Sequence, residues 1–294
     1  MKKEKSEEVN LCQNYAIEPV AVLNDTVGTM MSCAYQDQDQ SCVIGMIIGT
    51  GTNACYMEEM SNVEHIQGDE GEMCINTEWA SFGDNGCLQD IQTKFDKDLD
   101  GSSNSKGCFI FEKMISGMYL GELTRLLLVD MAEKKLLFGG EVSKALSERD
   151  RFQTSYISDI ERENTGLQRA QQILTGLGLS SKPEDCEIVR RVCETISSRS
   201  AHLCGAALAT IVKRIHNNRG LSQITVGVDG SVYRNHPYYR DRLGEMVKML
   251  APPNCIVRYA TTEDASGKGA AVVAAMAKRL GKKKSIELPV SFKA

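Results

Sequence analysis

Apolar and polar positions follow one another in blocks along the chain, and these blocks predict alternating strands and helices. Short apolar runs at 19–23 and 42–48 each end in a polar turn with glycine, which is typical of strands buried on both faces of a sheet. From about Phe111 to Leu136 apolar residues recur at helical spacing, and Gly139-Gly140 closes that helix. Further strands are expected at 223–231 and 255–259, further helices at 167–174, 187–217, 239–250 and from 264 to about 280, and a polar loop at 96–107. The alternation predicts an α/β fold, a mixed sheet flanked by helices.

The domain organisation follows from the same pattern. Residues 1–17 are polar and are expected to form a poorly ordered lead-in. The folded region is expected over 18–280, and 281–294 form a tail that begins with basic residues. No internal repeat or low-complexity segment is present in the sequence.

Composition narrows the class of protein. Hydrophobic residues make up 42% and charged residues 25% of the 294 residues, as in an ordinary globular protein. A net charge of -5 argues against a nucleic-acid binder, and the apolar runs are too short for a membrane span. The first eight residues lack the apolar segment of a signal peptide. The eleven cysteines are odd in number, scattered and without a Cys-x-x-Cys pair, so we expect a reduced, cytoplasmic protein without a zinc or dithiol centre.

Candidate chemistry gathers where predicted strands end. Asp25 follows the first apolar run, although a lone aspartate there is more often a turn former or a helix cap. The turn 49–52, Gly-Thr-Gly-Thr, allows close backbone approach and offers hydroxyls to phosphate, but it is neither a Walker A loop nor a dinucleotide fingerprint. Two more small-residue turns lie at 229–231 and 266–269. Because helix N-termini attract anions, these turns together are consistent with a nucleotide site, and a set of plain turns is the alternative.

Taken together, these segments closely resemble the hexokinase family. The resemblance extends from about Pro19 to Leu280. The segments that carry it are Asn24-Asp25-Thr26-Val27-Gly28-Thr29, Gly49 to Tyr56, Asn76-Thr77-Glu78-Trp79 through Asp84, Phe111 to Glu122, Gly227 to Tyr233, and Glu263 to Ala271.

The resemblance implies an actin-like ATPase (ribonuclease H-like) fold and ATP-dependent phosphorylation of a hexose, such as glucose, at its 6-hydroxyl. It makes Asp25 the general base, and it makes Asn24, Asn53, Glu78 and Glu112 the residues that hold the sugar hydroxyls. Magnesium is expected to arrive bound to ATP, without a metal site made of protein side chains. The residues implied to face the nucleotide are Gly49, Thr50, Gly51, Thr52, Gly117, Met118, Thr154, Ser158, Gly230 and Ser231.

Departures from the family pattern leave other functions open. The family has a first phosphate loop, a Ser-Phe-Pro segment and a Thr-Lys pair upstream of Asn24, and this chain begins too late to hold them. The family's Glu-Trp-Gly-Ala-Phe has Ala80-Ser81 here, its sugar-contacting glutamine is Phe109, and its Thr-Lys in the nucleotide segment is Thr154-Ser155. We therefore expect an incomplete sheet with an exposed edge, prone to self-association or to pairing with a complementing chain. A degenerate sugar- or nucleotide-binding protein is the alternative function, and another sugar kinase of the actin-like class is a third.

Overall fold

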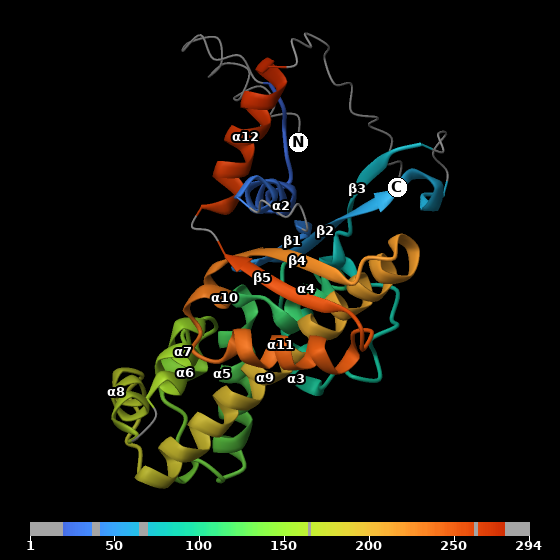
Figure 1. Ribbon diagram of the computed structural model, residues 1–294. Helices are drawn as coiled ribbons and strands as arrows, with labels where there is room; N and C mark the ends of the chain where they lie inside the picture. Colours follow the sequence, from blue (N-terminus) through green and yellow to red (C-terminus); the bar gives the residue numbers. More distant parts are fainter. Residues whose placement is uncertain (1–19, 37–41, 65–69, 164–165, 262–263, 280–294) are drawn as a thin grey trace, which may run out of the picture.

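A computed structural model describes residues 20–36, 42–64, 70–163, 166–261 and 264–279. These residues form three layers (Figure 1). Helices α2 (Asp25–Gln36) and α12 (Ala265–Arg279) lie on one side of a sheet, and the remaining long helices lie on the other. The lead-in expected at 1–17 and the tail expected at 281–294 lie outside the described residues.

The central layer is a five-stranded sheet with the order β3-β2-β1-β4-β5. Strand β1 pairs antiparallel with β2, β2 pairs antiparallel with β3, and both β1–β4 and β4–β5 are parallel. The mixed α/β sheet is therefore confirmed. Strands β3 and β5 lie at the two edges of the described sheet. The strands are β1 Cys42–Ile48, β2 Thr52–Glu59, β3 Glu72–Asn76, β4 Gln223–Asp229 and β5 Ile256–Thr261.

The other face of the sheet is covered by helices that come mostly from the middle of the chain (Figure 1). The expected helix at 239–250 is confirmed as α11, Tyr239–Leu250, and the one at 187–217 lies within the longer α9, Pro183–Arg219. The remaining elements are η1 Met60–Asn62, η2 Trp79–Ser81, α3 Lys94–Gly101, α4 Ile110–Ile115, α5 Gly117–Glu133, η3 Phe138–Gly140, α6 Lys144–Ser147, α7 Thr154–Arg162, α8 Gln168–Gly176 and α10 Ser231–Asn235.

Three local expectations were wrong. Residues 20–24 form no strand, because the side chains of Asn24 and Asp25 accept the Thr26 N–H and begin helix α2 there. The first part of the loop expected at 96–107 is helical, because a capping box of Thr93 and Asp96 starts α3, which ends at Gly101. The helix expected from Phe111 to Leu136 is two helices, α4 and α5, because the chain is extended at Ser116 (ψ 155°).

Glycine pairs let α2 lie unusually close to its neighbours. Gly45 of β1 and Gly227 of β4 are partners in the sheet register. A Cβ at Gly45 would lie 2.1 Å from the Thr26 carbonyl oxygen, and α2 also contacts Gly227. On its other side α2 meets α12, where a Cβ at Gly269 would lie 1.8 Å from the carbonyl oxygen of Gly28. The position of α2, and of Asp25 at its start, is therefore fixed by backbone packing from both sides.

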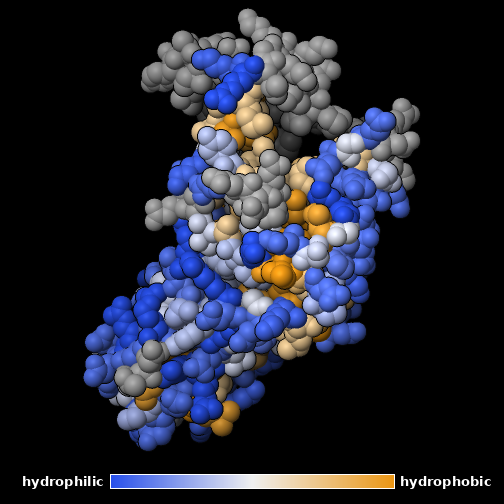
Figure 2. Space-filling model, viewed as in Figure 1, coloured by the Kyte–Doolittle hydropathy of each residue, from blue (hydrophilic) through white to orange (hydrophobic). Residues whose placement is uncertain are grey.

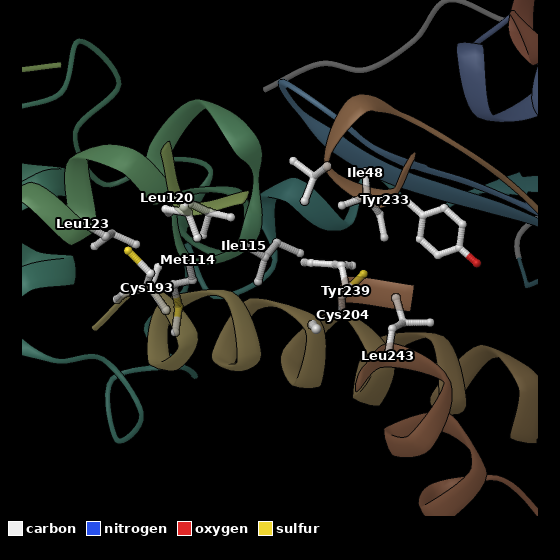
Figure 3. Packing of buried hydrophobic residues seen from close by; sticks show 14 of the residues in the cluster. Ile48, Met114, Ile115, Leu120, Leu123, Cys193, Cys204, Tyr233, Tyr239 and Leu243 are labelled. Atoms are coloured by element: carbon white, nitrogen blue, oxygen red, sulfur yellow. The ribbon is translucent and has the colours of Figure 1, made fainter. Parts of the chain in front are cut away.

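The main hydrophobic core lies between the sheet and the helices on the α9 side. In Figure 3, side chains from β1, α4, α5 and α11 point toward α9, and Cys193 and Cys204 of α9 lie among them. None of the ten cysteines in the described ranges forms a disulfide. Within those ranges, no helix is long and apolar enough to cross a membrane. Figure 2 shows mainly hydrophilic residues around α6–α8, whereas hydrophobic residues gather beside the sheet.

Candidate active site

Helix α2 begins at Asp25, the expected general base, and Asn24, expected to hold a sugar hydroxyl, comes directly before it. Asn24 Oδ1 accepts from the Thr26 N–H at 3.0 Å and from the Thr26 hydroxyl at 2.5 Å. Asp25 Oδ1 also accepts from the Thr26 N–H, at 2.8 Å, while the rest of the Asp25 side chain is exposed. The Asp25 carboxylate thus lies at the positive end of a 12-residue helix, with a surface open to a ligand.

A chain of amides and carboxylates leads from α2 across the sheet. Asn53 Nδ2 lies 3.5 Å from Asn24 Oδ1, 2.8 Å from Asn76 Oδ1 and 3.2 Å from Glu78 Oε1. The structure therefore brings together Asn24, Asn53 and Glu78, three of the residues expected to hold sugar hydroxyls. Asn76 was not expected there; its place at the end of an apolar run, two positions before Glu78, is the sequence signal that could have found it.

Glu112 joins this cluster from the other side of the turn after β1. Its Oε2 accepts from the Thr52 N–H at 3.1 Å, and a Cβ at Gly51 would lie 2.9 Å from the same oxygen. Burial raises the pKa of Glu112, the charge of Glu78 raises it further, and the Thr52 N–H acts in the opposite direction. The turn that contains Gly51 thus brings a half-buried carboxyl into the electrostatic field of Glu78.

The turn at 49–51 is docked on the start of α5. Gly117 N–H donates to the Gly49 carbonyl at 2.8 Å, and Met118 N–H donates to the Thr50 carbonyl at 3.1 Å. Thr52 is not in this turn but begins β2, and its hydroxyl donates to the Ile47 carbonyl and accepts from Trp79 Nε1. The Thr52 side chain therefore makes internal hydrogen bonds, and Thr50 is the exposed hydroxyl of the turn.

Beyond Thr50 a cleft of about 660 Å³ opens between α5, α7 and α10, a volume typical of a small-molecule site. The residues of the expected nucleotide set that line it are Thr50, Gly117, Met118, Thr154, Ser158 and Ser231. The Thr154 hydroxyl donates to the Gly117 carbonyl at 2.6 Å and accepts from the Gly121 N–H at 2.9 Å, so it also ties α7 to α5.

The remaining glycines of the expected nucleotide set, Gly49, Gly51 and Gly230, lie in the turns after β1 and β4, whereas Thr52 begins β2. Gly230 has a φ of 117°, and a Cβ on it would lie 2.2 Å from the Ile48 carbonyl oxygen. Gly49 faces Gly230 directly. Only glycine fits at position 230, because its positive φ disfavours other residues and the Ile48 backbone leaves no space for a side chain.

Two acidic residues near the site were missed by sequence reasoning. Asp84 accepts from the N–H groups of Phe109 and Ile110 at 3.1 and 2.9 Å, which fixes the start of the helix that carries Glu112. Asp229, at the end of β4, accepts from the N–H groups of Gly230 and Ala265 and so joins the sheet to α12. An aspartate at a strand or turn end is the signal for both, but the partners Phe109, Ile110 and Ala265 lie 25 to 36 positions away in the chain.

Metal-ligating residues are not clustered in the part of the chain that the structure describes. No group of three His, Cys, Asp or Glu side chains there is arranged to hold a metal ion.

The class of protein follows from the fold and from the site that it carries. A mixed sheet of order β3-β2-β1-β4-β5 is flanked by helices, with a polar cluster where the strands end and a nucleotide-sized cleft beside it. This is the α/β architecture of the actin-like ATPase fold. A glucokinase of the ROK family from Streptomyces griseus, solved in complex with glucose and AMPPNP, matches with a TM-score of 0.51 at 18% identity over 90% of this chain and 70% of that one. At that identity the likeness concerns the fold alone.

Closer relatives show the family. The family model described as hexokinase matches residues 43–276, so the chain belongs to the hexokinase family. It is 53% identical to human hexokinase-2 over 269 residues, which is 91% of this chain but 29% of that protein. The structure of a hexokinase from Schistosoma mansoni complexed with glucose matches with a TM-score of 0.81 and 43% identity, over 87% of this chain and 57% of that one. The chain thus spans less than a third of the curated relative's length.

Proposed function

We propose that this chain forms the part of a hexokinase that transfers a phosphoryl group from ATP to the 6-hydroxyl of a hexose, with glucose as the substrate. Family membership and the likeness to the glucose-complexed Schistosoma mansoni hexokinase support this choice. In this proposal the Asp25 carboxylate accepts the proton of the 6-hydroxyl, while Asn24, Asn53, Glu78 and Glu112 hold the other hydroxyls.

One observation supports the proposal above the others: the hydrogen-bonded cluster that begins at Asn24, next to Asp25, and extends through Asn53 to Glu78. A hexose offers hydroxyls around a ring, each both donor and acceptor. Amides and carboxylates set side by side match such vicinal pairs. Because Asp25 lies at the edge of the cluster and is exposed, a sugar held by the cluster would present one hydroxyl to it.

The donor nucleotide would occupy the cleft beside Thr50, with its phosphates toward the turn at 49–51. Gly49 and Gly230 pack closely on one another's backbone, which sets the shape of that turn beside the cleft. Mg²⁺ would be held by the phosphates of ATP. The protein contributes a base and aligns the two reactants, and positioning and charge stabilisation supply most of the rate in phosphoryl transfer.

The decisive experiment is a coupled assay with glucose and Mg-ATP on the wild type and on Asp25→Asn. We expect turnover to fall by about 10²–10⁴-fold, because the amide cannot accept the proton, while glucose affinity changes by only a few-fold. Asp241→Asn is a matched control: Asp241 is also an exposed aspartate in the first turn of a helix, far from the cluster in sequence. Equal turnover of Asp25→Asn and wild type would refute the role of Asp25.

One observation favours a second candidate, a sugar-binding protein without transfer activity. Asp25 Oδ1 accepts from the Thr26 N–H, a bond that an aspartate at a helix start makes without any catalytic role. In that case glucose would raise the melting temperature of the chain while Mg-ATP and glucose together gave no product. Melting curves with and without glucose, read beside the coupled assay, separate the two candidates.

A further inference from the structure

A second cleft, apolar and separate from the nucleotide cleft, lies where η2, α4 and α9 meet. Its volume is about 620 Å³, within the range of small-molecule sites. Its walls include Trp79, Phe82 and Phe111, and α9 contributes Leu203 and Ala207. Of the residues that we propose to hold the sugar, Glu78 also lines this cleft, and the cleft shares no lining residue with the proposed nucleotide cleft. Its apolar part is not used by either substrate, so its occupant goes beyond the proposed function.

The aromatic walls define the shape of that occupant. The rings of Trp79 and Phe111 have centroids 6.1 Å apart at 78°, and those of Phe82 and Phe111 lie 5.9 Å apart at 88°. Phe82 is 54% exposed, although the two rings beside it are buried. The three rings pack edge to face on one another and so form one aromatic wall, against which a flat apolar ring can lie. The small side chain of Ala207 on the facing helix leaves the space for it.

The charge of the lining defines the polar group of the occupant. Glu78 is the ionisable side chain among the residues that line the cleft, and no lysine, arginine or histidine accompanies it there. Its Oε1 accepts from the amide groups of Asn53 and Asn76, which hold the carboxylate in place. A fixed carboxylate beside an apolar pocket attracts a cation and repels an anion.

Residues that line the cleft also contact, or adjoin in the chain, the residues that we propose to bind the sugar. Trp79 Nε1 donates to the Thr52 hydroxyl at 3.0 Å, and the N–H of Thr52 donates to Glu112. Phe111 precedes Glu112 in the chain, and Glu78 precedes Trp79. An occupant therefore contacts the immediate neighbours of both carboxylates that we assign to sugar binding.

From these observations we infer that the cleft is a binding site for a small molecule with one planar apolar ring and one protonated amine. Its ring lies between the aromatic wall and helix α9, and its ammonium group lies on Glu78. The site lies outside the nucleotide cleft and takes a ligand of a different chemical class from either substrate. Binding there does not require phosphoryl transfer by the chain.

The test uses Trp79, which is the single tryptophan of the sequence and lies in the wall of the cleft. Its fluorescence is followed while the purified chain is titrated with 4-phenylbutylamine, 4-phenylbutan-1-ol and 4-phenylbutyrate, without sugar or nucleotide. We expect saturable binding of the amine, with a dissociation constant at least about tenfold lower than that of the carboxylate. Glu78→Gln is expected to abolish that preference while binding of the neutral alcohol remains.

Filling the cleft provides the second arm. Ala207→Leu, and independently Ala206→Leu, place extra volume in it and are expected to weaken amine binding by about tenfold or more. Thr195→Leu is the matched control, because Thr195 is exposed on the same helix outside this cleft. Melting curves identify any variant that fails to fold. If one of the two leucine variants fails, amine binding by the other one tests the inference. Absence of saturable binding, equal affinity for amine and carboxylate, or unchanged affinity in the folded filling variants would overturn the inference.

Discussion

Glu112 is the residue whose surroundings carry the clearest measurable consequence. Its carboxyl is half-buried behind the turn at 49–51 and lies in the field of Glu78. Burial first, and then the negative charge of Glu78, raise the pKa of Glu112 above its ordinary value of 4.5, against the opposing effect of the Thr52 N–H. The folded protein thus holds a proton on Glu112 at pH values where the unfolded chain has already lost it.

The sign of the pH dependence follows from linkage. Below pH 4.5 the group is protonated in both states, and as pH rises through the raised pKa of Glu112 the folded state loses stability relative to the unfolded chain. Glu112→Gln keeps an oxygen for the Thr52 N–H but has no charge. Its melting temperature should therefore rise relative to wild type by a few degrees between acid and neutral pH.

Melting curves at several pH values check this, with Glu133→Gln, an exposed substitution at the end of α5, as the control. The expectation is contradicted if the melting temperature of Glu112→Gln does not rise relative to that of wild type as the pH increases.

At the scale of elements, Gly45 and Gly227, which pack against α2, fix the position of Asp25 at the start of that helix. Gly45→Ala would place a methyl group 2.1 Å from the Thr26 carbonyl oxygen, so either α2 or β1 must shift. We expect a loss of about 3 kcal/mol in the free energy of unfolding and a melting temperature lower by roughly 5–10 °C. Denaturant titration and thermal melting measure both quantities.

The matched control for that substitution is Gly176→Ala in helix α8, where an added Cβ meets nothing within 4 Å. There the change should be neutral or stabilising by up to about 1 kcal/mol, because alanine is the better helix former. If both variants lose the same stability, close packing of α2 on Gly45 is not the cause.

Element boundaries show where sequence patterns stop being informative. Helices at 187–217 and 239–250 were predictable because their apolar periodicity is long. The break between α4 and α5 at Ser116 was not, since residues on both sides continue an apolar helical pattern. Gly117 N–H is instead held by the Gly49 carbonyl, a partner 68 residues away that no local pattern contains.

At the scale of the whole molecule, a buried ionic network joins helices from distant parts of the chain under the cleft that we propose for the nucleotide. Glu161 of α7 is fully buried, with Oε1 accepting from Ser197 at 2.5 Å and facing His236 Nε2 at 3.1 Å, and Oε2 accepting from Arg242 at 2.7 Å. His236 also lines the cleft, while Ser197 belongs to α9 and Arg242 to α11. This network therefore connects the wall of the cleft with the core.

We expect Glu161→Gln to destabilise the protein by about 3 kcal/mol or more, because Arg242 is left without its charge partner. The double variant Glu161→Gln with Arg242→Met should lose less than the sum of the two single losses, as a double-mutant cycle from denaturant titrations would show. Additive losses would mean that the pair is not coupled.

The pH dependence of this network has the opposite sign to that of Glu112. Burial alone would raise the pKa of Glu161. The hydrogen bond and charge of His236, together with hydrogen bonds from Ser197 and Arg242, hold this pKa below its ordinary value of 4.5. The stability that it contributes is full above pH 4.5 and is lost as pH falls through the lowered pKa. The difference in the free energy of unfolding between wild type and Glu161→Gln should therefore become smaller at acid pH. Denaturant titrations at a series of pH values measure this difference.

The sequence by itself determined the family, the α/β class and the candidate residues Asp25, Asn53, Glu78 and Glu112, because motifs and apolar periodicity are local properties of the chain. Tertiary structure decided which side chains meet: Asn76 between Asn53 and Glu78, Trp79 on Thr52, and the partners of Glu161. It also decided that α2 begins at Asp25, where a strand had been expected just before it. The physical reason is that hydrogen-bond partners and close contacts depend on the register of strands and helices far apart in sequence, and residue pattern alone does not encode that register.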